Sequence, residues 1–333
     1  MLTIYSHIYY IETASLENSN RIKYPVEYLE KNGIIPLNSN EVFIKNPMNL
    51  LYKYNSKDYL DKFVVNPEFT LCNHCLSKNF INDKKCKYCK KEFNKKLRKM
   101  LKDDPDTIIT ENTQNELMQV SKVLNYLIEN YNIYQNAYAL IRPPGHHAYI
   151  DNNEGFCIVN NAYILASELL LRSIVKNVLI FDWDLHHGNG TQNCILSSDN
   201  YNIFFVSTHY YSDDFYPRTG NDYKFNPEEK RLSNIYNFPI NKTMYSIFSE
   251  YFQDKIVPLL DRICEQTDLI IISNGLDAHK DDPFDKLNFT DDDYIYMTKY
   301  FTSKNKKIIF LLEGGYNPEI IARVSLKLIK IFN

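Results

Sequence analysis

The stretch VLIFDWDLHHGNGTQ, residues 178–192, begins as an apolar run and ends in a dense polar cluster. The VLIF run has the composition of a strand that is buried on both faces of a sheet. Residues 182–190 then supply two aspartates, two histidines and two glycines. Because ionised carboxylates are unfavourable to bury without compensation, the pattern predicts a strand that ends at a site where another group neutralises them.

Four other apolar runs resemble VLIF, and segments with helical patterns, such as 157–173, lie between them. The runs are YALI (138–141), IFFV (203–206), LIII (269–272) and IIFLL (308–312). Buried strands that alternate with helices indicate an α/β fold, in which a mainly parallel sheet is covered by helices on both faces. We therefore expect one three-layer domain over residues 1–333.

Polar motifs follow four of the five runs. YALI leads into RPPGHH, VLIF into DWDLHHG, LIII into SNGLDAH and IIFLL into EGGY. In parallel sheets, ligands bind beyond the carboxyl ends of the strands. We therefore expect these four motifs to meet at one edge of the sheet.

The spacing in the DWDLHH motif favours a metal ion. Asp182, Asp184 and His186 are two residues apart, and in an extended segment such residues point the same way. Two oxygens and one imidazole nitrogen, with an open fourth position, suit catalytic zinc. Asp277, beyond the LIII run, can supply the third protein ligand.

Five motifs in order resemble those of the zinc-dependent histone deacetylases. They are RPPGHHA (142–148), GFCIVNNA (155–162), DWDLHHGNGTQ (182–192), SNGLDAHKDDP (273–283) and LEGGY (312–316). The DWD, HHGN and DAH sequences favour the class II branch and the related acetylpolyamine amidohydrolases. The resemblance covers residues 103–333, and more weakly 1–62. It implies the three-layer fold of the arginase and deacetylase superfamily.

The resemblance implies roles for the metal-site residues. Asp184, His186 and Asp277 would bind the catalytic zinc. Asp182 would orient a catalytic histidine and, with Ser207, would bind a monovalent cation, usually potassium.

The resemblance also assigns the acid–base groups. His146 would pair with Asp182, which favours the imidazolium, and His147 would pair with the neutral Asn189, which favours a general base. The Tyr316 phenol would donate to the oxyanion that develops during amide hydrolysis.

Residues around the substrate are assigned in the same way. Phe156 and Tyr216 match aromatic walls of an acetyl-lysine tunnel, although Tyr216 stands where Phe is usual. Phe284 matches a selectivity position, where an apolar side chain removes the anion that would attract a polyamine. Asp104 matches an aspartate at the rim that binds the peptide backbone.

Residues 66–102 have few apolar side chains and many lysines, and we interpret them as an insertion. Cys72, Cys75, Cys86 and Cys89 form two CxxC pairs separated by ten residues. This spacing is typical of a structural zinc site of the zinc-ribbon type.

The role of the insertion is open. Residues 84–102 contain ten Lys or Arg, which would attract an acidic partner or nucleic acid, or form a solvated face. A homodimer through the insertion is a further alternative.

The sequence has no run of about 20 apolar residues and no charged leader before an apolar core, so we expect an intracellular protein of the nucleus or cytoplasm and no membrane partner. The resulting hypothesis is a zinc-dependent deacetylase acting on N-ε-acetyl-lysine in histones or other proteins. The alternatives are a deacetylase of acetylpolyamines or other small amides, a catalytically weak acetyl-lysine-binding scaffold, and an arginase-like binuclear manganese enzyme.

Overall fold

The three-dimensional structure is a computed structural model. It describes residues 1–7, 16–63, 69–71, 78–80, 85, 87–92, 106–107, 112–198, 201–221, 234–241, 248–284 and 286–333. Within these ranges, no helix combines the length and the apolar character that crossing a membrane requires.

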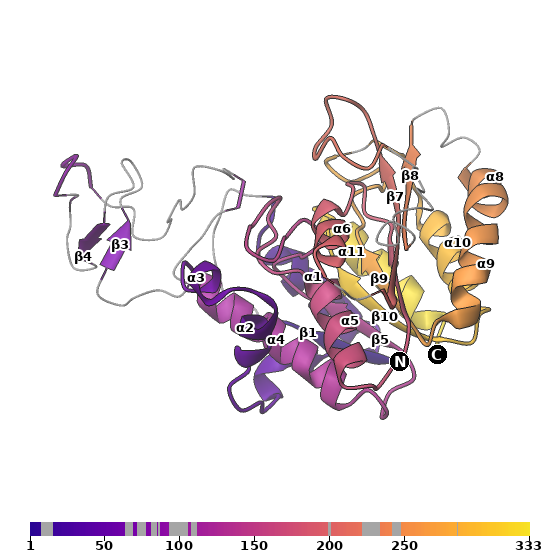
Figure 1. Ribbon diagram of the computed structural model, residues 1–333, viewed down its shortest axis with the longest axis horizontal. Helices are drawn as coiled ribbons and strands as arrows, with labels where there is room; N and C mark the ends of the chain where they lie inside the picture. Colours follow the sequence, from indigo (N-terminus) through magenta and orange to yellow (C-terminus); the bar gives the residue numbers. More distant parts are fainter. Residues whose placement is uncertain are drawn as a thin grey trace.

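Eight strands form one sheet with the order β2-β1-β5-β10-β9-β6-β7-β8 (Figure 1). The strands are β1 (Leu2–Tyr5), β2 (Leu37–Asn38), β5 (Ala137–Leu140), β6 (Val178–Asp182), β7 (Ile203–Tyr210), β8 (Ile235–Ile240), β9 (Leu269–Asn274) and β10 (Lys307–Leu312). Every pairing in this sheet is parallel, which confirms the predicted architecture.

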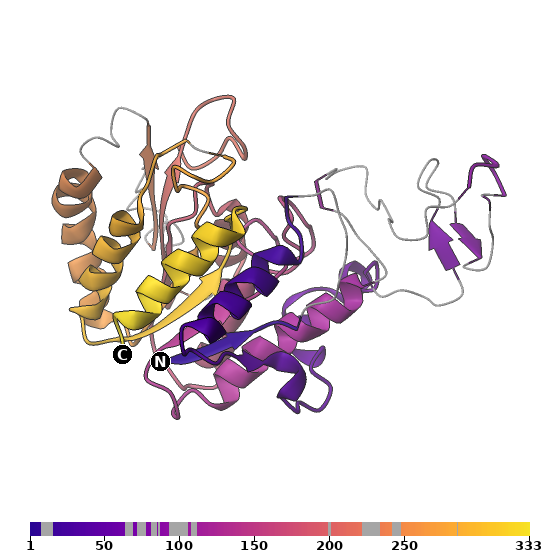
Figure 2. The ribbon, with the colours of Figure 1, turned by 180° about the vertical axis from the view of Figure 1, so that it is seen from behind.

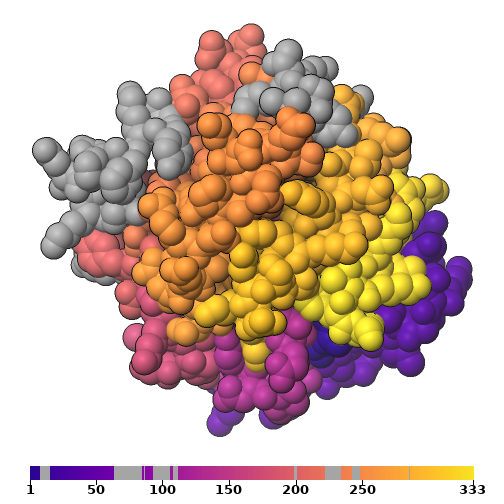
Figure 3. Space-filling view, turned by 90° about the vertical axis from the view of Figure 1, so that its right-hand side faces the viewer, coloured from indigo at the N-terminus to yellow at the C-terminus, as the bar shows by residue number. Residues whose placement is uncertain are grey.

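Helices cover both faces of the sheet, as Figures 1 and 2 show from opposite sides. One layer contains α2 (Asn49–Tyr54), α3 (Lys57–Leu60), α4 (Thr113–Glu129), α5 (Asn161–Leu171) and α6 (Asn189–Leu196). The other contains α1 (Asn20–Lys31), α8 (Phe248–Tyr251), the π-helical turn Phe252–Ile256, α9 (Val257–Gln266), α10 (Asp291–Thr302) and α11 (Pro318–Lys330). A short 3-10 helix spans Ser39–Glu41. The orange and yellow C-terminal part of the chain covers much of the side seen in Figure 3.

The side chains of β6 alternate between the two helical layers. Val178 and Ile180 belong to the core on one face, and Leu179 and Phe181 belong to the core on the other. All residues of this strand are buried. This burial on both faces explains why the run is apolar without interruption.

The five predicted apolar runs coincide with the strands β5, β6, β7, β9 and β10, except that β5 ends one residue before the end of the YALI run. The helix predicted near 157–173 is shorter, because α5 begins only after Asn160, whose Oδ1 accepts a hydrogen bond from the Tyr163 N–H at 3.0 Å. Strands β1, β2 and β8 were not predicted. They are edge or near-edge strands, and their burial is less complete.

The predicted insertion contains two short strands, β3 (Phe69–Leu71) and β4 (Lys78–Phe80), which form an antiparallel pair outside the main sheet. Cys89 lies in a described turn and is half-buried. Cys72, Cys75 and Cys86 lie outside the described residues, so the four-cysteine zinc site stays a prediction.

Candidate active site

The three residues predicted to bind the metal converge beyond β6 and β9. His186 Nδ1 lies 3.2 Å from Asp184 Oδ1 and 2.9 Å from Asp277 Oδ2. One ligand atom from each residue lies within 4.8 Å of the other two, and all three side chains are buried. The structure therefore brings together, in a buried position, groups that are far apart in the sequence.

Backbone N–H groups hold the two carboxylates. Asp184 accepts from the N–H of His186 at 2.9 Å and of Gly314 at 2.7 Å. Asp277 accepts from the Leu185 N–H at 2.9 Å. Gly314 also makes room, because a Cβ there would lie 2.4 Å from Asp184 Oδ2 and 2.6 Å from Asp277 Oδ2. A side chain at this position would displace the carboxylates.

This donor set fits a divalent cation. Two carboxylates and one imidazole are ligands of catalytic zinc sites. Burial raises the pKa of Asp277, and the negative charge of Asp184 raises it further. A cation between these residues would remove the repulsion between the two carboxylates, so Asp184, His186 and Asp277 are the residues that would hold it.

His146 lies between two aspartates. Its Nδ1 is 3.0 Å from Asp182 Oδ2, and its Nε2 is 3.7 Å from Asp184 Oδ1. Burial lowers the pKa of His146, but the charges of Asp184 and Asp182 outweigh burial and raise it to about 10. These contacts favour the imidazolium form at neutral pH.

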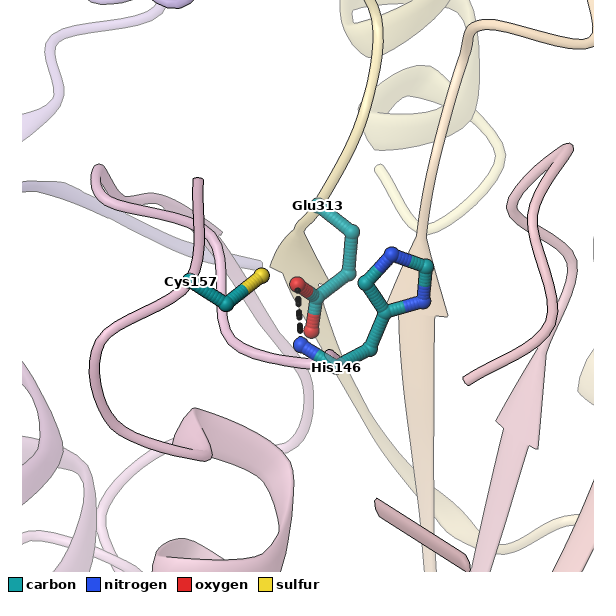
Figure 4. Close-up of side chains that lie close together, drawn as sticks. All are labelled: His146, Cys157 and Glu313. Carbon is teal, nitrogen blue, oxygen red and sulfur yellow. Dashed lines mark hydrogen bonds between the residues drawn. The ribbon is translucent and has the colours of Figure 1, made fainter. Parts of the chain in front are cut away.

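Glu313 holds the turn that carries the two histidines. Its Oε2 accepts from the backbone N–H of Gly145 at 2.6 Å. It also accepts from the backbone N–H of His146 at 3.1 Å, the bond drawn in Figure 4. Its Oε1 accepts from Ser273 Oγ at 3.3 Å. No role was predicted for Glu313, because two of its three hydrogen-bond donors are backbone N–H groups, which no motif reveals.

Cys157 lies beside this turn, and one potential ligand atom each of Cys157, His146 and Glu313 lies within 4.8 Å of the others (Figure 4). These atoms already have protein partners. Cys157 Sγ donates to Gly155 O at 3.4 Å, His146 Nδ1 meets Asp182, and Glu313 accepts three hydrogen bonds. We interpret this cluster as a support for the histidine turn.

His147 has a different environment from His146. Its Nδ1 lies 2.6 Å from Asn189 Oδ1. Burial, followed by the charges of His146 and His186, holds the pKa of His147 well below its usual value. A neutral imidazole whose Nε2 has no hydrogen-bond partner among the described residues suits a general base.

Tyr316 is held by Arg21 and Asp282. The Arg21 guanidinium carbon is 4.9 Å from the centroid of the Tyr316 ring, and Arg21 Nε donates to Gly315 O at 2.5 Å. Asp282 accepts from the Tyr316 N–H at 2.7 Å. Asp282 also accepts from the Phe284 N–H at 3.2 Å, so it connects the segment of Tyr316 to that of the predicted selectivity residue.

Aromatic side chains surround Tyr316 and His186. The ring centroid of Phe284 is 5.1 Å from that of Tyr316 and 5.2 Å from that of His186. Phe156 lies 5.7 Å from Tyr316. Phe215 stacks on His186 at 4.9 Å and 11°, a contact that sequence analysis missed.

Tyr216 lies on the histidine side of this group, with its ring centroid 5.0 Å from that of His147. Tyr216, Phe156 and Phe284 thus all lie at the site, as the tunnel prediction requires. Asp104, the predicted rim residue, lies outside the described residues.

The two residues predicted to bind potassium are neighbours in the sheet. Asp182 of β6 pairs in register with Ser207 of β7. Asp182 Oδ1 accepts from the Asp184 N–H at 3.1 Å, and Ser207 Oγ lies 2.9 Å from His209 Nδ1. A potassium ion beside them stays a prediction.

A buried ion-pair network anchors the start of the histidine turn. Arg142 Nη2 lies 2.6 Å from Glu17, and Arg142 Nη1 lies 2.5 Å from Glu116. Glu17 also pairs with Arg21 at 3.1 Å. Sequence analysis did not predict this network, because Glu17, Glu116 and Arg142 come from separate segments.

Comparison with protein families shows a match to the histone deacetylase domain over residues 15–332. Among curated proteins, the chain is 37% identical over 202 residues to type-2 histone deacetylase 2 of Dictyostelium discoideum, which covers 56% of this chain and 12% of that protein. It is 34% identical over 187 residues to acetylpolyamine amidohydrolase of Mycoplana ramosa, which covers 55% of this chain and 53% of that protein. The match therefore spans less than two thirds of either relative.

Among solved structures, the fold is similar to that of an acetylpolyamine aminohydrolase from Burkholderia pseudomallei, with a TM-score of 0.75 and 21% sequence identity. The match covers 100% of this chain and 98% of that chain. At this identity the similarity supports the fold alone.

Proposed function

The chain belongs to the histone deacetylase family, and on this premise we propose that it is a zinc-dependent deacetylase that hydrolyses N-ε-acetyl-lysine in a protein to lysine and acetate. One observation carries the proposal. Asp184, His186 and Asp277 converge beside a pair of histidines with unlike partners and beside Tyr316.

Amide hydrolysis needs an activated water, a stabilised oxyanion and a proton for the leaving amine. A zinc ion held by Asp184, His186 and Asp277 would act as a Lewis acid on water and on the substrate carbonyl. His147 Nδ1 lies 2.6 Å from Asn189 Oδ1, and with its hydrogen on Nδ1 the imidazole would leave Nε2 to take the proton from water. The low pKa of His147, caused by burial and by neighbouring positive charge, keeps this nitrogen unprotonated at neutral pH.

His146 and Tyr316 complement the base. The imidazolium of His146, held by Asp182, places a positive charge beside the reacting groups. The Tyr316 side chain supplies a hydroxyl donor for the oxyanion. Arg21 and Asp282 fix the segment of Tyr316 from two sides.

The aromatic side chains favour an acyl-lysine over a free polyamine. Phe156 and Phe284 both contact Tyr316, and apolar walls suit the butyl stem of lysine. Phe284 brings no negative charge toward a second amine. Deacetylation of acetylpolyamines is the second candidate, because one protein of similar sequence and one of similar structure are both named for that substrate.

Acetate release from an acetyl-lysine peptide and from N-acetylspermidine tests the proposal. We expect the higher kcat/KM for the peptide with the zinc-loaded chain. Phe284→Glu should shift the preference toward the polyamine, and Phe284→Leu serves as the uncharged control. A higher kcat/KM of the unmodified chain for the polyamine would favour the second candidate.

The remaining cofactors and partners are parts of the same proposal. We expect about two zinc ions per chain, one at the site above and one at Cys72, Cys75, Cys86 and Cys89. Metal analysis of the protein, with and without the Cys72→Ser substitution, tests the second ion. Binding of an acidic partner or nucleic acid at 84–102, a homodimer through the insertion, and a nuclear or cytoplasmic location stay proposals.

A further inference from the structure

The amide of Asn189 has two hydrogen-bond donors and one acceptor, and the structure gives each a partner. Asn189 Nδ2 donates to Glu154 Oε2 at 2.9 Å and to the Tyr149 hydroxyl at 2.8 Å. Asn189 Oδ1 faces His147 Nδ1 at 2.6 Å. Asn189 itself is 6% exposed, so water has little access to replace these partners.

We propose that Glu154 is a positioning residue that sets the tautomer of His147 by fixing the orientation of the Asn189 amide. The inference depends on the proposed function, because His147 is the general base there. Sequence analysis did not identify Glu154, which lies just before the GFCIVNNA motif.

The donors and acceptors of these side chains fix the orientation of the amide. An ionised carboxylate only accepts hydrogen bonds, so Glu154 requires the NH2 group of Asn189 to face it. The amide oxygen must then face His147. Because that oxygen only accepts, Nδ1 of His147 must carry the hydrogen, and Nε2 is left with a lone pair for the proton of water.

The backbone around Glu154 keeps its carboxylate in place. Its N–H and C=O both pair with Cys157, at 3.2 Å and 2.9 Å. Gly155 follows with φ +53°, and a Cβ there would lie 2.5 Å from the His147 ring. Only a glycine therefore lets this segment pass so close to His147.

Reversing the amide would bring Asn189 Oδ1 against the carboxylate of Glu154. The reversed form would lose a hydrogen bond to a charged group, which corresponds to a preference on the order of 10- to 100-fold for the observed orientation. Tyr149 supports this orientation when its hydroxyl accepts from Nδ2.

Inverting the polarity at position 154 tests the proposal. In Glu154→Lys, the ammonium only donates, so Asn189 should turn its oxygen toward Lys and force the hydrogen of His147 onto Nε2. We expect kcat for the acetyl-lysine peptide to fall by about 100-fold, the lower range of general-base contributions. The kcat of Glu154→Gln, whose amide can donate or accept, should lie between that of the unmodified chain and that of Glu154→Lys. Asp151→Lys, at an exposed aspartate of the same segment, makes the same charge change and should stay within about twofold, because it does not touch the amide.

The rescue is the decisive comparison. A carboxylate at 189 accepts from His147 Nδ1 whatever lies at 154, so Asn189→Asp should restore the activity of Glu154→Lys to within about tenfold of the unmodified chain. The Glu154→Lys substitution should therefore lower kcat when residue 189 is Asn and raise kcat when residue 189 has been changed to Asp. A purely structural role for Glu154 predicts a loss in both backgrounds, and that result would overturn the inference.

Nitrogen NMR of ¹⁵N-histidine-labelled protein gives a readout that does not depend on turnover. The unmodified zinc-loaded chain should show His147 protonated at Nδ1, and Glu154→Lys should show it protonated at Nε2. The Nδ1 tautomer in both proteins would refute the inference. An unmodified chain without deacetylase activity would instead refute the proposed function, while the NMR result would still decide the role of Glu154.

Discussion

Replacing Glu313 tests how the fold holds the catalytic histidines. The carboxylate is fully buried and accepts from the backbone N–H of both Gly145 and His146. Glu313→Ala leaves both donors without an acceptor, at roughly 1–3 kcal/mol each. The expected loss in the free energy of unfolding is therefore about 2–6 kcal/mol. Glu313→Gln keeps an oxygen at this point and should stay within about 1 kcal/mol of the unmodified chain.

Urea unfolding of the zinc-loaded protein measures the free energy of unfolding, and acetate release measures kcat and KM. Because the donors belong to the histidine turn, Glu313→Ala should lower kcat more than it changes KM. Equal unfolding free energies for the Ala variant and the unmodified chain would refute the reasoning. A Gln variant as unstable as the Ala variant would show that charge, and not the accepted hydrogen bonds, is what matters.

Three further predictions follow from described contacts. Tyr316→Phe removes the oxyanion donor and should lower kcat by about 10²–10³-fold with unchanged zinc content by metal analysis; unchanged turnover would contradict its role. Asp277→Asn should abolish zinc retention at the catalytic site on dialysis and lower the melting temperature of the zinc-loaded protein; a retained ion would contradict the assigned ligand set. Burial raises the pKa of Glu116 from 4.5 to about 7, so its ionisation destabilises the folded state increasingly as the pH rises through that window. In urea unfolding, the difference in unfolding free energy between Glu116→Gln and the unmodified chain should therefore shift by about 2–3 kcal/mol in favour of Gln from pH 5 to pH 8. A difference that stays constant with pH would contradict the shifted pKa.

The central strands and the residues at their ends were predictable because their signals are local. Continuous apolar runs mark β5, β6, β9 and β10, whose residues are buried almost throughout. The Asp-x-Asp-x-His spacing marks one half of the metal site. Asp277 lies 2.9 Å from His186 because β6 pairs in parallel with β9. The alternation of strands and helices suggests a parallel sheet, but no sequence pattern shows which strands are neighbours.

The supporting groups were harder to predict, because they bind backbone atoms or one another across the fold. Glu313 accepts from N–H groups that every turn possesses. Glu17 and Glu116 look like surface carboxylates in the sequence, but in the fold both are buried and each pairs with Arg142. In the sequence, Glu154 is one acidic residue of a polar loop. Only the structure shows that it accepts a hydrogen bond from Asn189.

The position of β10 affects the order of events during folding. Among the described residues it is the last strand in sequence, yet it lies between β5 and β9 in the sheet. Asp184 accepts from Gly314, which is 130 residues away in sequence. Such high contact order predicts slow folding. Until β10 has been synthesised, β5 and β9 would each expose an open strand edge, and the Gly314 N–H that holds Asp184 would be missing from the metal site.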